Sequence, residues 1–70
     1  MIAQNSEYAT YTTYNNGTQL IVSFFHITHI IADADATKGS WIWFTSGKSV
    51  HVDENYEVVQ SDFTTFLENR

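Results

Sequence analysis

The sequence contains no cysteine and no proline, and only three of its 70 residues are basic. Without cysteine, the chain can form neither a disulfide nor a thiolate metal site, so a domain of this size must gain its remaining stability from packing or self-association. The three basic residues, Lys38, Lys48 and Arg70, face eight acidic ones, which gives a net charge of −5. Because a negative protein repels the phosphate backbone of nucleic acids, we expect no general nucleic-acid binding.

The chain also lacks long apolar runs. No stretch is long enough to span a bilayer, and no basic segment precedes an apolar one as it would in a signal peptide. We therefore expect a cytoplasmic protein that does not enter membranes. Hydrophobic residues still make up 43% of the chain, which is too apolar for intrinsic disorder, and the length allows one core. The sequence predicts a single domain over residues 1–70.

Five segments have the composition of β-strands. Aromatic and β-branched residues favour an extended backbone, and they dominate residues 8–14, 19–22, 27–33, 41–46 and 48–52. Asn16-Gly17 tolerates the positive φ angles of a tight turn, which predicts an antiparallel hairpin between the first two segments. Ser23 to His26 is expected to form a short corner or helical turn before the third.

A change of hydrophobic period near the end of the chain predicts a helix. Residues with three- and four-residue spacing share one side of it, namely Tyr56, Val59, Phe63, Phe66 and Leu67. Asp53 or Asn55 could cap its first amides. We prefer one helix over about 55–68, although Ser61-Asp62 could instead cap a second, shorter one. The expected fold class is α+β: a small antiparallel β-meander of about five strands with one C-terminal helix.

The fourth strand is expected to be apolar on both faces. Side chains alternate along a strand, so Trp41 and Trp43 point one way while Ile42 and Phe44 point the other. One helix can cover only one of these faces. A bent sheet, a second subunit or a ligand must cover the other, and we expect a homo-oligomer. Pairing between the amino-terminal strands would also remove the edge that residues 8–14 present.

The only candidate metal cluster combines His26, His29 and His51 with Asp33 and Asp35. On a regular strand, the odd separation of His26 and His29 places them on opposite faces, which favours ordinary structural hydrogen bonds over a metal site. The sequence has no nucleophile elbow and no glycine-rich phosphate loop. We expect no enzyme activity, no cofactor and no bound metal.

Aromatic residues carry the strongest functional signal. Tyrosine and tryptophan combine a large contact area with a hydrogen-bonding group and are common where partners or flat ligands bind. The alternative is that they serve core and subunit packing alone. The residues predicted to bind a ligand or partner are Tyr11, Tyr14, His29, Trp41, Trp43, Lys48 and His51.

Several short patterns resemble the small FlbD-type flagellar and swarming proteins. They are Gly17 to Val22, His26-Ile27 with His29-Ile30, Ile42 to Lys48, and Val50 to Glu54 followed by Glu57-Val58-Val59. The resemblance covers about residues 12–63 and implies a strand-rich, non-enzymatic accessory module that binds proteins. The tyrosine-rich amino-terminal strand, the loop from Asp33 to Ser40 and the Trp41-Ile42-Trp43 run depart from that pattern.

In general character the chain is also similar to the small inhibitor and sponge proteins that bacteriophages encode. Such proteins bind stoichiometrically as compact oligomers, with pockets where subunits meet. From this we expect a non-enzymatic, homo-oligomeric binding protein that sequesters a small nucleotide-like signal molecule or a host defence protein. The alternative is a FlbD-like accessory module.

Overall fold

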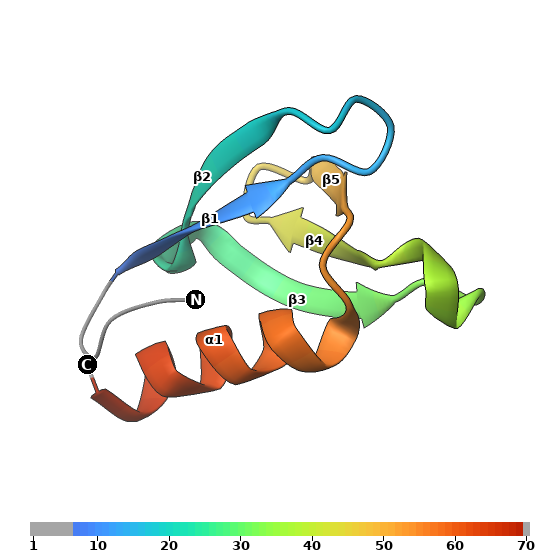
Figure 1. The fold of residues 1–70 in the computed structure, drawn as a ribbon. Helices are drawn as coiled ribbons and strands as arrows, with labels where there is room; N and C mark the ends of the chain where they lie inside the picture. The colour runs from blue at the N-terminus through green and yellow to red at the C-terminus, as the bar shows by residue number, and fades with distance from the viewer. Residues whose placement is uncertain (1–6, 70) are drawn as a thin grey trace.

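The computed structural model describes residues 7–69. Its five strands form two antiparallel sheets (Figure 1). The hairpin sheet pairs β1 (Tyr8–Thr12) with β2 (Gln19–Ser23). The three-stranded sheet follows the order β3 (Ile27–Ala32), β4 (Ser40–Phe44) and β5 (Ser49–Val52).

Two 3₁₀ turns and one α-helix complete the fold. The turn η1 (Phe24–His26) leads from β2 into β3, and η2 (Ala36–Lys38) lies between β3 and β4. The helix α1 (Tyr56–Asn69) runs along one side of the strands (Figure 1). The Asn55 side chain accepts a 3.1 Å hydrogen bond from the Val58 N–H, which confirms the predicted cap.

The predicted α+β fold with five antiparallel strands and one C-terminal helix is confirmed. The strands are divided between two sheets, because the turn η1 changes the direction of the chain between β2 and β3. The Phe24 side chain of this turn is buried in the core. β1 is shorter than predicted and ends at Thr12. Beyond it, Thr13 forms an isolated bridge with Val52, and the Tyr14 N–H donates to the His51 carbonyl. The carboxyl end of the first strand is therefore paired with β5 and is not the free edge that the sequence predicted.

The core lies between the two sheets and the helix. It consists of the buried residues Ala9, Tyr11, Val22, Phe24, Ile27, Ile42, Val52, Val59 and Phe66. Every strand and the helix contribute to this set, so the elements depend on one another for burial. Ile42 faces inward and is fully buried, whereas Trp41 and Trp43 are only half-buried. The predicted alternation along β4 is confirmed.

A β-bulge at Thr28 decides which side of β3 faces the core. The register advances from the pair Ile27–Phe44 to the pair His29–Trp43, with one extra residue on β3. Because of this extra residue, Ile27 faces the core and His29 faces the other way. A regular strand would have put both on one face.

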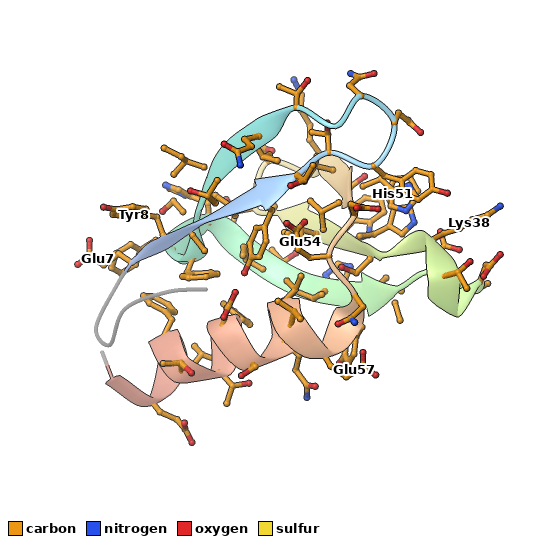
Figure 2. All side chains as sticks on the ribbon, in the orientation of Figure 1. Glu7, Tyr8, Lys38, His51, Glu54 and Glu57 are labelled. Carbon is orange, nitrogen blue, oxygen red and sulfur yellow. The ribbon has the colours of Figure 1, made fainter. Side chains whose placement is uncertain are left out.

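Hydrogen bonds from both sheets fix the segment that leads into the helix. The Thr12 N–H donates to both carboxylate oxygens of Glu54, at 2.9 and 3.1 Å, and the Thr12 carbonyl accepts from the Asp53 N–H. The buried Ser40 hydroxyl donates to the Glu54 carbonyl at 2.9 Å. Figure 2 shows Glu54 at the centre of the molecule. The segment after β5 thus joins both sheets.

Within residues 7–69, no helix has the length and apolar character needed to cross a membrane.

Candidate binding site

The outward side of the three-stranded sheet carries a group of aromatic side chains. Cross-strand partners share a face of a sheet, and the register aligns Ile31 with Trp41 and His51 in one row. The second row consists of His29, Trp43 and Ser49, with Trp43 in the middle. We call the surface formed by Tyr14, His29, Ile31, Trp41, Trp43 and His51 the aromatic face.

Three rings of the aromatic face form a continuous stack. The Tyr14 and His51 ring centroids lie 4.4 Å apart with an interplanar angle of 10°. His51 stacks on Trp41 at 4.2 Å and 15°. In the second row, His29 lies against Trp43 at 5.7 Å and 13°. These near-parallel arrangements hold the indole rings in fixed orientations.

A shallow hollow of about 310 Å³ lies on the aromatic face, lined by Ile31, Trp41 and Trp43. His51 covers one side of the Trp41 ring and belongs to β5. Ile31 belongs to β3, on the opposite side of β4. The hollow therefore lies where the stack of rings ends, on the side of Trp41 that faces away from His51.

Asp33 holds the Trp41 ring in place through a hydrogen bond. The indole Nε1–H donates to Asp33 Oδ2 at 3.0 Å, and the Asp35 N–H donates to Asp33 Oδ1 at 2.9 Å. The hydrogen bonds from Asp35 and then Trp41 hold the pKa of Asp33 below its ordinary value. The carboxyl group is thus ionised at neutral pH and accepts both bonds.

The loop that carries Asp33 is itself ordered by hydrogen bonds. The Asp35 carboxylate accepts from the Thr37 hydroxyl at 2.7 Å and from the Thr37 N–H at 3.0 Å. These two bonds lower the pKa of Asp35. The loop is a structural support for the aromatic face.

His51 is held by the same loop. Its Nε2 lies 2.5 Å from the Lys38 carbonyl oxygen and 3.6 Å from Asp33 Oδ2. A carbonyl can only accept, so Nε2 carries the proton. Figure 2 shows His51 with Lys38 beyond it at the side of the sheet. The imidazole is oriented for stacking on Trp41.

One pair on the sheet resembles a nucleophile with its base. Thr28 Oγ1 lies 2.9 Å from His29 Nδ1. The hydroxyl also donates to the Trp43 carbonyl at 3.2 Å, which uses its single proton. His29 Nδ1 is then the donor toward Thr28. In this arrangement the Thr28 hydroxyl links β3 to the backbone of β4.

The structure brings together five of the seven predicted site residues: Tyr14, His29, Trp41, Trp43 and His51. Tyr11 lies elsewhere, because it is only 1% exposed and its hydroxyl donates to Asp62 within the core. Lys48 is exposed in the turn between β4 and β5, where its carbonyl accepts from the Phe44 N–H.

Sequence reasoning missed two contributors. Ile31 lines the hollow and remains 47% exposed, and Asp33 was considered only as a metal ligand. The alternation of strand residues contained the signal for Ile31, since it lies two positions from His29. In the part of the chain that the structure describes, no three side chains of His, Asp or Glu are grouped as a metal site. His26, His29 and His51 do not converge.

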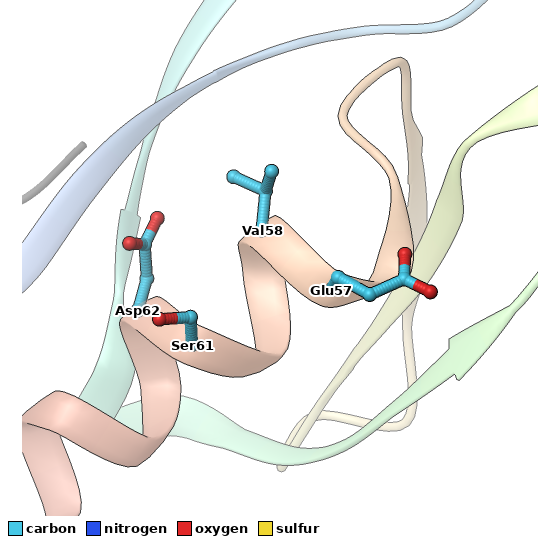
Figure 3. Close-up of a pocket in the computed structure, with 4 residues that line it drawn as sticks. All are labelled: Glu57, Val58, Ser61 and Asp62. Carbon is cyan, nitrogen blue, oxygen red and sulfur yellow. The ribbon is translucent and has the colours of Figure 1, made fainter.

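A second hollow, of about 350 Å³, lies on the helix and is lined by Glu57, Val58, Ser61 and Asp62 (Figure 3). Its Val58 and Asp62 side chains point toward β1, while Glu57 extends away from them. Asp62 accepts the hydrogen bond from Tyr11. The carboxylate therefore serves the core, and this hollow has no ring against which a flat ligand could stack.

No protein-family model, curated protein or solved structure matches this chain.

Proposed function

We propose that the chain is a non-catalytic binding protein that captures a small ligand with a flat, nucleobase-type ring on its aromatic face. The observation that carries this proposal is the ordered stack of Tyr14, His51 and Trp41 that ends at a hollow. A flat ring placed there extends the stack by one member. Trp43 and Ile31 are the other two residues that line the hollow.

The size and rigidity of the site favour such a ligand. The hollow, at about 310 Å³, is at the lower end of the range of roughly 300–1,000 Å³ that is usual for small-molecule sites. Trp41 is already oriented by Asp33 and His51, so binding orders few side chains. A preorganised ring reduces the entropic cost of association. Stacking of a base on an aromatic side chain contributes about 1–3 kcal/mol.

The charge of the protein indicates whether the ligand is neutral or anionic. The chain has a net charge of −5, and its described cations, Lys38 and Lys48, lie in the turns on either side of β4. All three residues that line the hollow are apolar. A neutral base or nucleoside therefore fits better than a polyphosphate, which an acidic protein repels.

The hydrogen-bonding state of the titratable groups argues for capture without turnover. Asp33 and Asp35 accept bonds from their own loop, and the Thr28–His29 pair has its hydroxyl proton directed to a carbonyl. General acid–base catalysis needs a group free to exchange a proton with the substrate. The aromatic face instead offers rings and a fixed shape.

Docking of a protein is the second candidate, because Ile31 is 47% exposed beside the two indole rings. Exposed apolar patches on small domains are common sites of protein association. A FlbD-type accessory role and capture of a host defence protein both stay predictions of this kind. The two candidates differ in whether an isolated ring is sufficient for binding.

The test is isothermal titration calorimetry with adenosine, guanosine, cytidine and uridine as probes and ribose as the ringless control. We expect at least one nucleoside to bind more tightly than ribose by tenfold or more. Its 5′-monophosphate is expected to bind more weakly. If all four nucleosides behave like ribose, the ring-capture proposal is wrong.

Variants locate the site. Trp41→Ala is expected to weaken nucleoside binding by tenfold or more, since it removes the stacking surface. Trp41→Phe keeps a ring and is expected to lose less. Leu67→Ala is the matched control, because Leu67 is exposed on the helix and lies outside the aromatic face. Equal binding by Trp41→Ala and the control would exclude the hollow as the site.

A further inference from the structure

Among residues 7–69, strand β2 has one hydrogen-bonded edge and one open edge. β1 is the one strand paired with it among the described residues. β3, at the end of the other sheet, packs against the helix instead. β2 reads Gln19-Leu20-Ile21-Val22-Ser23 and carries neither proline nor a charged side chain that would block pairing.

The register shows which backbone groups point to that open edge. The Thr13 N–H bonds to the Thr18 carbonyl, and the Phe24 N–H bonds to the Glu7 carbonyl. Hydrogen-bonded pairs recur at every second residue of an antiparallel ladder. The backbone N–H and C=O groups of Leu20 and Val22 therefore point toward β1. The N–H and C=O groups of Gln19, Ile21 and Ser23 therefore point away from it.

These outward groups are self-complementary about Ile21. An antiparallel copy of β2 with a two-fold axis at Ile21 aligns Ile21 with its own counterpart. The same axis aligns Gln19 with Ser23 of the copy. Each of these is a hydrogen-bonded pair, in which both partners exchange their N–H and C=O groups. No outward group within Gln19 to Ser23 is left without a partner.

Side chains and charge favour the same arrangement. Ile21 is 70% exposed, and Tyr8 on the neighbouring strand is 58% exposed. Pairing would bring two copies of Ile21 side by side on one face of the joined sheet. Because β2 is uncharged in a chain of net charge −5, this edge lets two acidic molecules meet without opposing carboxylates.

We propose that two copies of the chain associate through antiparallel pairing of their β2 edges, with the two-fold axis at Ile21. The result is a continuous four-strand sheet in the order β1, β2, β2, β1. The dimer is isologous and closes on itself. This surface is separate from the aromatic face, so the dimer proposal does not depend on the proposal of ligand capture.

The first test is the mass of the protein in solution, measured by light scattering over a range of concentrations. We expect twice the chain mass of 8.0 kDa. Ile21→Lys places two like charges at the axis and is expected to weaken the dimer at least tenfold. Ile31→Lys is the control on the aromatic face and is expected to leave the dimer intact. A wild-type monomer at all concentrations would overturn the proposal.

A backbone variant and a crosslink test the register itself. Ile21→Pro removes an N–H that points away from β1, so we expect a folded monomer. Ile21→Cys is expected to form a disulfide dimer on mild oxidation, because hydrogen-bonded partners have Cα atoms about 5.5 Å apart, within disulfide range. The chain has no other cysteine.

Thr10→Cys is the matched control for the crosslink. Thr10 pairs with Ile21 from β1, so its counterpart in the dimer is three strand spacings away, roughly 14 Å. We expect no disulfide from this variant. A dimer that survives Ile21→Lys and fails to crosslink at position 21 would show that the copies meet elsewhere. If Ile21→Pro does not fold, the lysine and cysteine variants decide the question.

Discussion

The Tyr11 hydroxyl donates a 2.8 Å hydrogen bond to Asp62 Oδ2 across 51 residues of sequence. Tyr11 is 1% exposed and Asp62 is 8% exposed. Burial, followed by the hydrogen bond to Asp62, raises the pKa of Tyr11 well above its ordinary value. The phenol is therefore a permanent donor, and it links β1 to the middle of the helix.

Tyr11→Phe is expected to destabilise the fold by about 1.5–3 kcal/mol, the usual range for a hydrogen bond to a charged group. The substitution keeps the buried ring but leaves the Asp62 carboxylate without its donor. Urea denaturation followed by circular dichroism measures the change. Tyr8→Phe is the control, since Tyr8 is 58% exposed, and it is expected to change stability by less than about 0.5 kcal/mol. Equal effects would mean that the Tyr11 hydroxyl contributes nothing.

Gly39 and Gly47 allow a paired test of backbone strain. Both have positive φ angles, 76° and 87°, which L-residues rarely adopt. A Cβ at Gly39 would also collide with the Val52 carbonyl oxygen, whereas a Cβ at Gly47 would meet open space. We expect Gly47→Ala to cost about 1 kcal/mol.

Gly39→Ala is expected to cost roughly 3 kcal/mol or more, because β5 must move to admit the methyl group. Thermal denaturation of the two variants side by side measures the difference. Similar melting temperatures would contradict the close approach of Gly39 to β5.

Acid pH is expected to release Trp41 from Asp33. The folded-state pKa of Asp33 is lowered by the bonds from Asp35 and Trp41. Its stabilising contribution is therefore complete above the ordinary carboxyl pKa of 3.8, and it is lost as pH falls through the lower folded value. The indole N–H resonance of Trp41 in ¹⁵N-labelled protein is expected to shift in that acid range.

Asp33→Asn removes the titrating group and leaves one acceptor oxygen in place of two. We expect the acid shift of the Trp41 indole signal to disappear in this variant. Trp43→Phe assigns the signal, because the chain contains only two tryptophans. A Trp41 resonance that titrates identically in Asp33→Asn would mean that another group causes the shift.

The local pattern of the sequence was sufficient to predict most of the fold. The alternation in Trp41-Ile42-Trp43 predicts which rings lie outside the core, and the three- and four-residue spacing predicts the helix. Both signals depend only on the repeat of the backbone. The cap at Asn55 is also a local interaction. For these reasons the sequence of β4 was sufficient to predict that Trp41 and Trp43 share the outward face of the sheet.

Long-range contacts could not be predicted in this way. The sequence gives no sign that Asp62 is buried, because its donor lies 51 residues earlier. The bulge at Thr28 depends on how β3 meets β4, and it decides that His29 faces outward. The bonds from Thr12 and Tyr14 to the β5 segment likewise exist only once both sheets have formed. Tyr11 is buried, and composition does not reveal which tyrosines face inward.

Glu54 is expected to stabilise the junction of the two sheets. Both of its carboxylate oxygens accept the Thr12 N–H, at 2.9 and 3.1 Å. Glu54→Ala removes these acceptors and is expected to cost about 1–3 kcal/mol, because a part-buried amide loses its partner. Glu54→Gln keeps one acceptor oxygen without the charge, so a smaller loss is expected.

Hydrogen exchange at the Thr12 amide reports this junction directly. We expect faster exchange in Glu54→Ala than in Glu54→Gln, and the slowest exchange in the unmodified chain. Glu57→Gln is the control, since Glu57 is exposed in the first turn of the helix. If the Thr12 amide exchanges equally fast in the glutamate-54 variants and the control, the carboxylate does not hold β1 to the segment after β5. The two sheets would then be held together by backbone hydrogen bonds, by the bond from the Ser40 hydroxyl to the Glu54 carbonyl and by the shared core.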